Sequence, residues 1–201
     1  MQHPLEFIPA QYQKRSFLTF LFLTLLLFSI FRLLDKPLQT PASPNGIVSF
    51  ELARTPQQAQ EMIDVWTGRT TIYSDGEHSN ARTVPPGEPF LYNAEPMLNA
   101  AFGLGLDYLF MPVYALALAF GTLLAAQKHS GWFRSLGAVA GYGAFVAVLL
   151  DAVENFALWR VLSGAFESNY PAIAAFCATI KFVLLIVGMI YAFGGWLLPK
   201  N

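Results

Sequence analysis

Four long apolar runs constrain this 201-residue chain more than any other feature of its sequence. A bilayer core about 30 Å thick requires about 20 consecutive apolar residues in a helix, and each run comes close to or exceeds that length. The runs cover residues 17–34, 99–126, 135–163 and 171–198. Because lipid offers the backbone no hydrogen-bonding partner, each segment must pair its own N–H and C=O groups, as a helix does. The sequence therefore predicts an all-α membrane protein built as a four-transmembrane-helix bundle in a lipid bilayer.

The composition supports this class and argues against several others. Hydrophobic residues make up 55% of the chain and charged residues 12%, against about 25% charged in an ordinary soluble domain. A formal net charge of −1 gives no concentrated basic face, so we expect no nucleic-acid partner. The single cysteine, Cys177, excludes an internal disulfide and the paired thiols of disulfide-exchanging quinone reductases. Because His3, His78 and His129 lie outside the apolar runs, we expect no metal or other cofactor in the membrane.

Charges at the ends of the runs predict the orientation of the chain. Basic residues precede the first run, separate the second from the third and follow the fourth, whereas the loop after the third run is balanced. These residues are Lys14, Arg15, Lys128, Arg134 and Lys200, against Arg160 and Glu167. By the positive-inside rule, both termini, with the tail 1–16, are cytoplasmic and residues 35–98 are exported. The first run is longer than a signal-peptide core and carries Arg32, so we expect it to remain as a signal anchor. In its size and number of apolar runs, the chain resembles small bacterial membrane proteins. This resemblance implies that the protein is located in a bacterial inner membrane.

The exported segment 35–98 predicts a small α/β cap between the first two membrane helices. A short apolar and β-branched run at 47–52 favours a strand. Residues 56–66 favour a helix, because Thr55 is a good N-cap and the apolar side chains that follow fall on one face. A cap of about thirty residues cannot bury a core of its own. We therefore expect it to rest on the bundle, on lipid headgroups or on a partner, as either a structural lid or a docking element.

The rest of the exported segment predicts one more strand and a loop. Residues 69–74 are rich in Thr, Ile and Tyr, which favours a strand, and Asp75-Gly76 after them favours a tight turn. Residues 80–96 carry Pro, Gly and Asn without any hydrophobic period, which is typical of a loop.

Ionisable residues lie inside three of the four apolar runs. Asp107 is in the second run, Asp151 and Glu154 are in the third, and Lys181 is in the fourth. Counted from the expected outer ends, all of them lie about 12–18 Å along their helices. Each also shares a helix face with small residues, which mark close packing between membrane helices. The sequence therefore predicts that these side chains meet in the interior, with Asp151 and Lys181 as an ion pair.

Further polar side chains could join this cluster. Asn155, Tyr108 and Tyr114 could supply hydrogen bonds, and Arg32 could either snorkel to water or reach inward. With three carboxylates against one or two cations, Glu154 is the candidate for a proton or a ligand, and Asp107 for a second partner of the lysine. Two interpretations remain open: the charges fix the register of the helices, or they bind a ligand, an ion or a proton.

These observations favour three hypotheses of function, in decreasing order. The first is a non-enzymatic accessory or scaffold subunit that meets a membrane-protein partner or forms a homo-oligomer. The second is a small carrier, channel or receptor that binds a cation, a proton or a lipid-like ligand at the acidic cluster. The third is an intramembrane lipid-modifying enzyme in which Glu154 or Asp151 acts as acid or base. Cys177 is expected to be a small core residue, since no membrane histidine is there to activate it.

Overall fold

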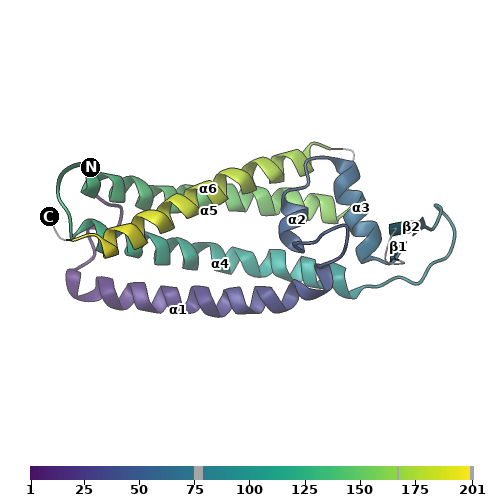
Figure 1. The fold of residues 1–201 in the computed structure, drawn as a ribbon, viewed down its shortest axis with the longest axis horizontal. Coiled ribbons are helices and arrows are strands. Elements are labelled where there is room, and N and C mark those ends of the chain that lie inside the picture. The colour runs from purple at the N-terminus through teal and green to yellow at the C-terminus, as the bar shows by residue number, and fades with distance from the viewer. Residues whose placement is uncertain (75–78, 167, 200–201) are drawn as a thin grey trace. The chain divides into compact units, whose positions relative to one another are not determined.

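The computed structural model describes residues 1–74, 79–166 and 168–199. It is mostly helical, with a small two-stranded sheet, and Figure 1 shows the order of its elements. The four longest helices cover the four predicted apolar runs, apart from the last residue of the third and of the fourth run. They are α1 (Ala10–Leu34), α4 (Glu95–Ala126), α5 (Gly131–Leu162) and α6 (Tyr170–Leu197). Each is long and apolar enough to cross a membrane. The lengths and composition of these helices fit a multi-pass membrane protein.

The chain divides into two compact units, and the four long helices contribute to both. Unit 1 comprises Met1–Ser29, Asp107–Ala152 and Cys177–Asn201. Unit 2 comprises Ile30–Leu106 and Val153–Phe176. About 20 residues of each long helix belong to unit 1, and the rest of each helix belongs to unit 2.

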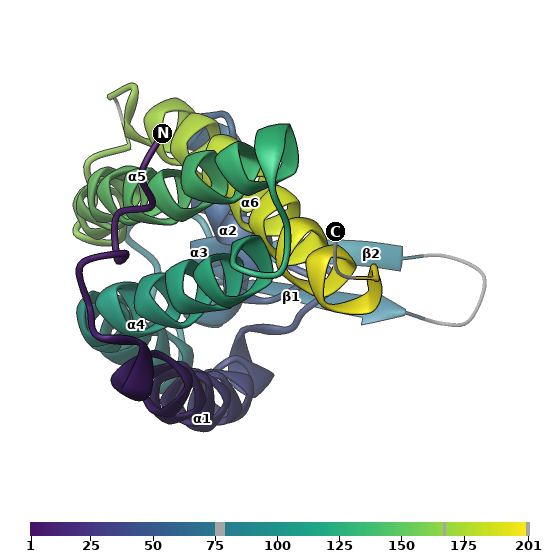
Figure 2. The same cartoon turned by 90° about the vertical axis from the view of Figure 1, so that its left-hand side faces the viewer.

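Unit 1 is a four-helix bundle. In Figure 2, α1 lies beside α4, and the rings of Phe20 and Phe120 stack between them at a centroid distance of 6.2 Å. Phe17 of α1 also contacts Trp196 of α6. The outer face of α1 is apolar and exposed, as at Phe22 and Leu25, and Leu27 is the one apolar residue of this helix that is buried. α1 is therefore the peripheral helix of unit 1, and its apolar run of Leu and Phe without Gly or Ala fits that position.

Small residues allow the other helices of unit 1 to approach closely. A Cβ atom added at Gly188 of α6 would lie 2.8 Å from a methyl group of Leu118 in α4, and one at Gly195 would lie 2.9 Å from the Cβ of Ala125. Gly137 of α5 is similarly close to Tyr191. Small side chains at membrane interfaces bring helix backbones together and increase their van der Waals contact. The packing faces predicted from the spacing of small residues are therefore the buried ones.

Unit 2 has an apolar core built around two aromatic side chains. Phe50 of α2 (Ile47–Glu51) and Trp66 of α3 (Pro56–Trp66) are each 1% exposed, and their rings lie 5.2 Å apart. They pack on Leu104 of α4 and Leu158 of α5. The Trp66 indole N–H donates to the carbonyl oxygen of Leu38, at the end of the 3-10 helix Lys36–Leu38, over 2.9 Å. The cap therefore rests on the helical segments of its own unit.

The predicted strand at 47–52 is wrong, because α2 occupies that stretch. Gly46, at φ 57°, turns the chain, and the carboxylate of Asp35 accepts the Ile47 N–H over 2.7 Å at the start of α2. Ile47 and Phe50 are three residues apart, so one helical turn places both against the core. The apolar run of residues was too short to distinguish a strand from a helical turn by its pattern.

The sheet of unit 2 is a hairpin that follows α3. Strand β1 (Thr70–Ser74) pairs antiparallel with β2 (Ser79–Thr83), and the hydroxyl groups of Thr70 and Thr83 lie 2.9 Å apart. The range 80–96 was predicted to be loop, which is wrong for the residues of β2. Its polar sequence carries no strand pattern, and backbone pairing with β1 forms the strand. The predicted Asp75-Gly76 turn lies outside the described residues.

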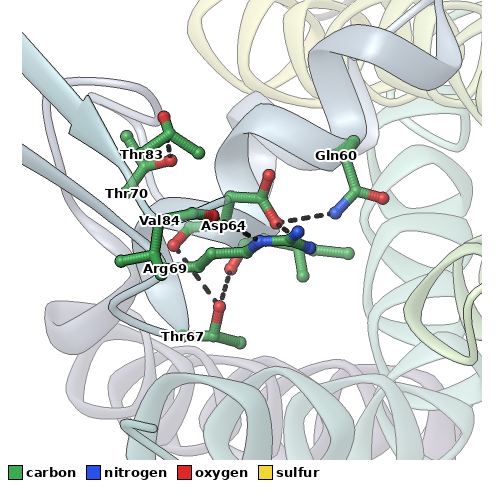
Figure 3. Close-up of polar contacts among 8 residues, drawn as sticks. Gln60, Asp64, Thr67, Arg69, Thr70, Thr83 and Val84 are labelled. Carbon is green, nitrogen blue, oxygen red and sulfur yellow. Dashed lines mark hydrogen bonds and ion pairs between the residues drawn. The ribbon is translucent and has the colours of Figure 1, made fainter. Parts of the chain in front are cut away.

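A polar network joins α3 to the hairpin (Figure 3). The carboxylate of Asp64 accepts a hydrogen bond from the Gln60 side chain over 2.7 Å and lies 4.0 Å from the Arg69 guanidinium. Arg69 in turn donates to the carbonyl oxygen of Val84 over 3.3 Å. The helix begins as predicted by its cap, since the Thr55 hydroxyl oxygen accepts the N–H of Gln58.

Candidate functional site

The centre of the candidate site is an ion pair inside unit 1. Lys181 of α6 places its Nζ 2.8 Å from Oδ1 of Asp151 on α5. Asp151 is 2% exposed and Lys181 is 5% exposed. Removing two charges from water costs several kcal/mol per ion, so such a pair persists only with short contacts and further hydrogen bonds. The structure thus confirms the predicted pairing of Asp151 with Lys181.

A third helix completes the arrangement around Asp151. The hydroxyl of Tyr114 on α4 donates to Oδ2 of Asp151 over 2.8 Å. Both carboxylate oxygens of Asp151 therefore accept hydrogen bonds, one from each neighbouring helix. The Lys181 ammonium also lies 4.8 Å from the ring centre of Phe182, a favourable cation–π distance. The three side chains Asp151, Tyr114 and Lys181 form what we call the triad, which connects α5, α4 and α6.

Glu154 and Asn155 lie on α5 in unit 2, about one turn along the helix from Asp151. Both are buried, at 0% and 1% exposed. The Asn155 amide donates to the carbonyl oxygen of Leu104 on α4 over 3.3 Å. Asn155 therefore connects two helices of unit 2, and the fully buried carboxylate of Glu154 marks this turn of α5 as polar.

The remaining predicted site residues are more exposed. Asp107 is half-buried on α4. Tyr108, beside it in sequence, is 48% exposed. Arg32 is exposed near the end of α1. Of the two tyrosines considered, only Tyr114 is seen to donate to a carboxylate of the predicted cluster among the described residues.

Sequence reasoning missed a buried histidine in unit 1. His3 is 6% exposed, and its Nδ1 accepts the N–H of Leu5 over 3.2 Å. Nε2 therefore carries the proton of the neutral ring and donates it to the Thr122 hydroxyl oxygen on α4 over 3.1 Å. The ring also occupies space left by Gly141 of α5, where a Cβ atom would overlap it. Nothing in the residues around His3 shows that the segment folds back onto α4.

Burial determines the protonation of His3. It lowers the pKa of the imidazole from 6.5 to about 4, while the nearby carboxylate of Glu6 acts in the opposite direction. The pKa of Glu6 is itself lowered, first by the His3 backbone N–H that it accepts and then by its ion pair with Arg134. His3 is therefore neutral at pH 7.

Other polar contacts gather at the same end of unit 1, where Figure 1 places both termini. The Gln127 amide donates to the side-chain oxygen of Gln13 over 2.8 Å. His129 donates from Nε2 to the carbonyl oxygen of Gly195 over 3.0 Å, and Lys128 lies 4.5 Å over the ring of Trp196. These contacts connect the start of the chain, the α4–α5 loop and the end of α6.

The geometry of the triad suits holding helices together better than proton transfer to a substrate, because both oxygens of Asp151 are already engaged. Within the described parts of the chain, no three His, Cys, Asp or Glu residues are grouped as a metal would need. Cys177 is buried at 5% exposure, as a core residue would be. No family model, curated protein or solved structure matches the chain in comparisons of all three kinds. The chemistry of its own residues therefore carries the functional argument.

Proposed function

We propose that the chain is a non-enzymatic accessory or scaffold subunit of a membrane complex, in which the triad fixes the register of three helices. The observation that supports this most is the closed coordination of Asp151 by Lys181 and Tyr114. A carboxylate that accepts hydrogen bonds at both oxygens fixes the positions of the two helices that donate them. This role of Asp151 is permanent and needs no ligand.

The setting of the triad makes this role physically reasonable. Lipid tails are as apolar as leucine, so apolar side chains gain little by leaving lipid for a helix interface. Close packing and polar contacts must then specify which helix faces meet. The triad sets the axial position of α4, α5 and α6, and the glycine contacts of unit 1 set their spacing.

The same proposal includes an orientation, with both termini cytoplasmic and residues 35–98 exported across a bacterial inner membrane. In unit 1, Lys14 and Arg15 are exposed, and Lys128 lies against Trp196, an amphipathic pair suited to a membrane interface. A thiol reagent that does not cross membranes should label a Glu88→Cys variant from the outside of intact cells, because Glu88 is exposed in the segment expected outside. Labelling of this variant only after cell lysis would contradict the orientation.

A double-mutant cycle tests the register role of the triad. Removing one partner of a buried pair costs about 3–5 kcal/mol, whereas removing both charges is often close to neutral. We expect Lys181→Met and Asp151→Asn each to lower the melting temperature in mild detergent strongly, and the double variant to recover most of the loss. An additive double variant, as unstable as the sum of the two changes, would contradict the register role.

The accessory role needs its own test. Mild-detergent purification from native membranes after chemical crosslinking should recover a second membrane protein in fixed ratio. The variant Arg69→Ala, which changes the cap and leaves the triad intact, is the control and should recover the same second protein in the same ratio. A monodisperse chain that is recovered alone under every mild condition would count against an accessory subunit.

A second candidate function rests on Glu154, a carboxylate that is 0% exposed on α5. Buried ionisable groups in membrane helices are by default candidates for ion or proton binding. If Glu154 binds a proton or cation in use, the melting temperature should change between pH 5 and pH 8, and Glu154→Gln should remove that change. A Glu154→Gln variant with the wild-type pH profile would eliminate this candidate.

A further inference from the structure

An apolar tip projects from the loop that leads into α4. Phe90 is 38% exposed, Leu91 is 92% exposed and Tyr92 is 55% exposed. The rings of Phe90 and Tyr92 lie 6.3 Å apart, so the tip is a small cluster. Figure 1 shows this stretch in the loop between β2 and α4. Burying so much apolar surface would be favourable, and within unit 2 nothing buries Leu91 among the described residues.

Contacts at the base of the tip attach it to the cap. The N–H of Asn93, directly after the tip, donates to the carbonyl oxygen of Thr67 over 2.9 Å. The carbonyl oxygen of Leu91 lies so close to Gly68 that a Cβ there would be 3.0 Å from it. Gly68 also has φ 80°, which favours glycine. The backbone of the tip thus packs on the cap, whereas its side chains are exposed.

The tip directly precedes a membrane-spanning helix. Tyr92 is three residues before α4 begins at Glu95, and the predicted apolar run starts at residue 99. Four helical residues rise about 6 Å and the three residues before them span at most about 10 Å, so the tip lies no more than about 16 Å from the start of that run. Exposed apolar side chains continue along the same segment of α4 at Leu98 and Phe102. A Phe-Leu-Tyr cluster at this height has the composition of an interfacial anchor.

We propose that Phe90, Leu91 and Tyr92 insert into the outer headgroup region of the membrane that the chain spans, and anchor the cap there. The proposal rests on the membrane placement stated under "Proposed function". A second copy of the chain is a poorer occupant of this surface. Three partly exposed side chains offer at most a few hundred Å², whereas a stable interface buries about 800 Å² on each partner.

Depth-dependent quenching tests the anchor in the full-length protein. An environment-sensitive fluorophore is attached at Leu91→Cys in a Cys177→Ala background, and the protein is placed singly in phosphatidylcholine nanodiscs. Spin-labelled lipids carry the quencher either near the headgroup or deep in the acyl chain. Glu88→Cys, also exposed in the same loop, is the matched control, and Val187→Cys, 55% exposed in α6, reports on membrane insertion itself. If Cys177→Ala does not fold, Cys177→Ser replaces it.

The expected result is a blue-shifted emission at position 91 that the headgroup quencher reduces more than the deep quencher does, because interfacial side chains lie only about 5–10 Å into the boundary region. Position 88 should emit as in water. Water-like emission at 91 together with deep quenching at 187 would overturn the anchor and leave the membrane placement intact. A blue shift at 91 without quenching would also overturn it, because protein would then cover the tip. Absence of quenching at 187 would overturn the membrane placement, and the anchor with it.

Discussion

Different kinds of contact stabilise the interior of each of the two units. In unit 1, polar side chains join segments that are far apart in sequence, as Lys181 joins Asp151 and His3 joins Thr122. In unit 2, an apolar core around Trp66 and Phe50 fixes the cap, and the polar network of Asp64 and Arg69 lies partly exposed beside it. The Lys181–Asp151 pair of unit 1 is thus buried, whereas the Asp64–Arg69 pair of unit 2 remains near the surface.

Under the proposed membrane placement, this difference follows from the solvent around each unit, which is water around the cap and lipid around the helices. A cap that faces water gains about 25 cal/mol for each Å² of apolar surface it buries, so apolar packing is sufficient to fix it. Helices in lipid gain little in this way, and their specificity must come from polar contacts and close packing. The contrast implies that apolar substitutions should matter most in unit 2, and single polar substitutions most in unit 1.

The largest effect among tests of this contrast is expected at Trp66. Trp66→Ala leaves a cavity in the core of unit 2 and removes the donor to Leu38, which should cost about 3–5 kcal/mol of stability. Amide hydrogen exchange over residues 47–66 measures the loss locally. Trp66→Phe is the control, because it keeps most of the volume. A loss of less than about 1 kcal/mol in Trp66→Ala would show that the cap does not depend on a water-excluding core.

Acid should weaken unit 1 through His3. The pKa of His3 is about 4 when folded and 6.5 otherwise, because burial disfavours the charged ring. The unfolded chain therefore binds the proton first, so the contribution of His3 is full above pH 6.5 and declines as the pH falls toward 4. Partial solvent screening reduces the expected loss to about 1–2 kcal/mol. Thermal melting between pH 7 and pH 4 measures it.

The controls for His3 separate its titration from that of its neighbours. His3→Gln keeps a donor for Thr122 but does not titrate, so its melting temperature should vary less over this range. Glu6→Gln removes the neighbouring carboxylate and its ion pair with Arg134 and should retain the decline. An unaltered acid response in His3→Gln would assign the response to another group.

A smaller effect is expected from the tyrosine of the triad. Tyr114→Phe removes the hydrogen bond to Asp151 and leaves the ion pair with Lys181, at a cost of about 1 kcal/mol for a bond between membrane helices. Tyr108→Phe is a matched control on the same helix, because Tyr108 is largely exposed. Equal melting temperatures for the two variants would remove Tyr114 from the set of contacts that hold unit 1.

The smallest effect is expected from the polar network of the cap. Arg69 lies 4.0 Å from Asp64 with its side chain 30% exposed, and such pairs contribute about 0–1 kcal/mol. Arg69→Ala should therefore change stability by about 0.5 kcal/mol, with a dependence on salt. A loss as large as that of Trp66→Ala would show that polar contacts dominate unit 2 as well.

The parts of the fold that sequence could predict are those set by strong local patterns. The four apolar helices follow from run length, and α3 follows from its Pro56 start and the Thr55 cap. The Asp151–Lys181 pair follows from the cost of an isolated charge in lipid, which requires a partner at the same depth.

The parts that sequence could not predict depend on contacts distant in the chain. The segment 47–52 forms a helix because Asp35 caps it and a core lies below, neither of which its own residues encode. Strand β2 consists of polar residues and exists through pairing with β1. The burial of His3 requires Thr122 and the space above Gly141, more than a hundred residues away.

The glycine contacts of unit 1 bear on how other chains with this architecture could be found. Gly137, Gly188 and Gly195 each leave no room for a methyl group, whereas the exposed leucines and phenylalanines of the long helices need only be apolar. The overall sequence identity could therefore become low while the three glycines, the acid on one helix and the amine on another keep their positions. A search weighted toward that sparse pattern would reach relatives that a whole-chain comparison overlooks.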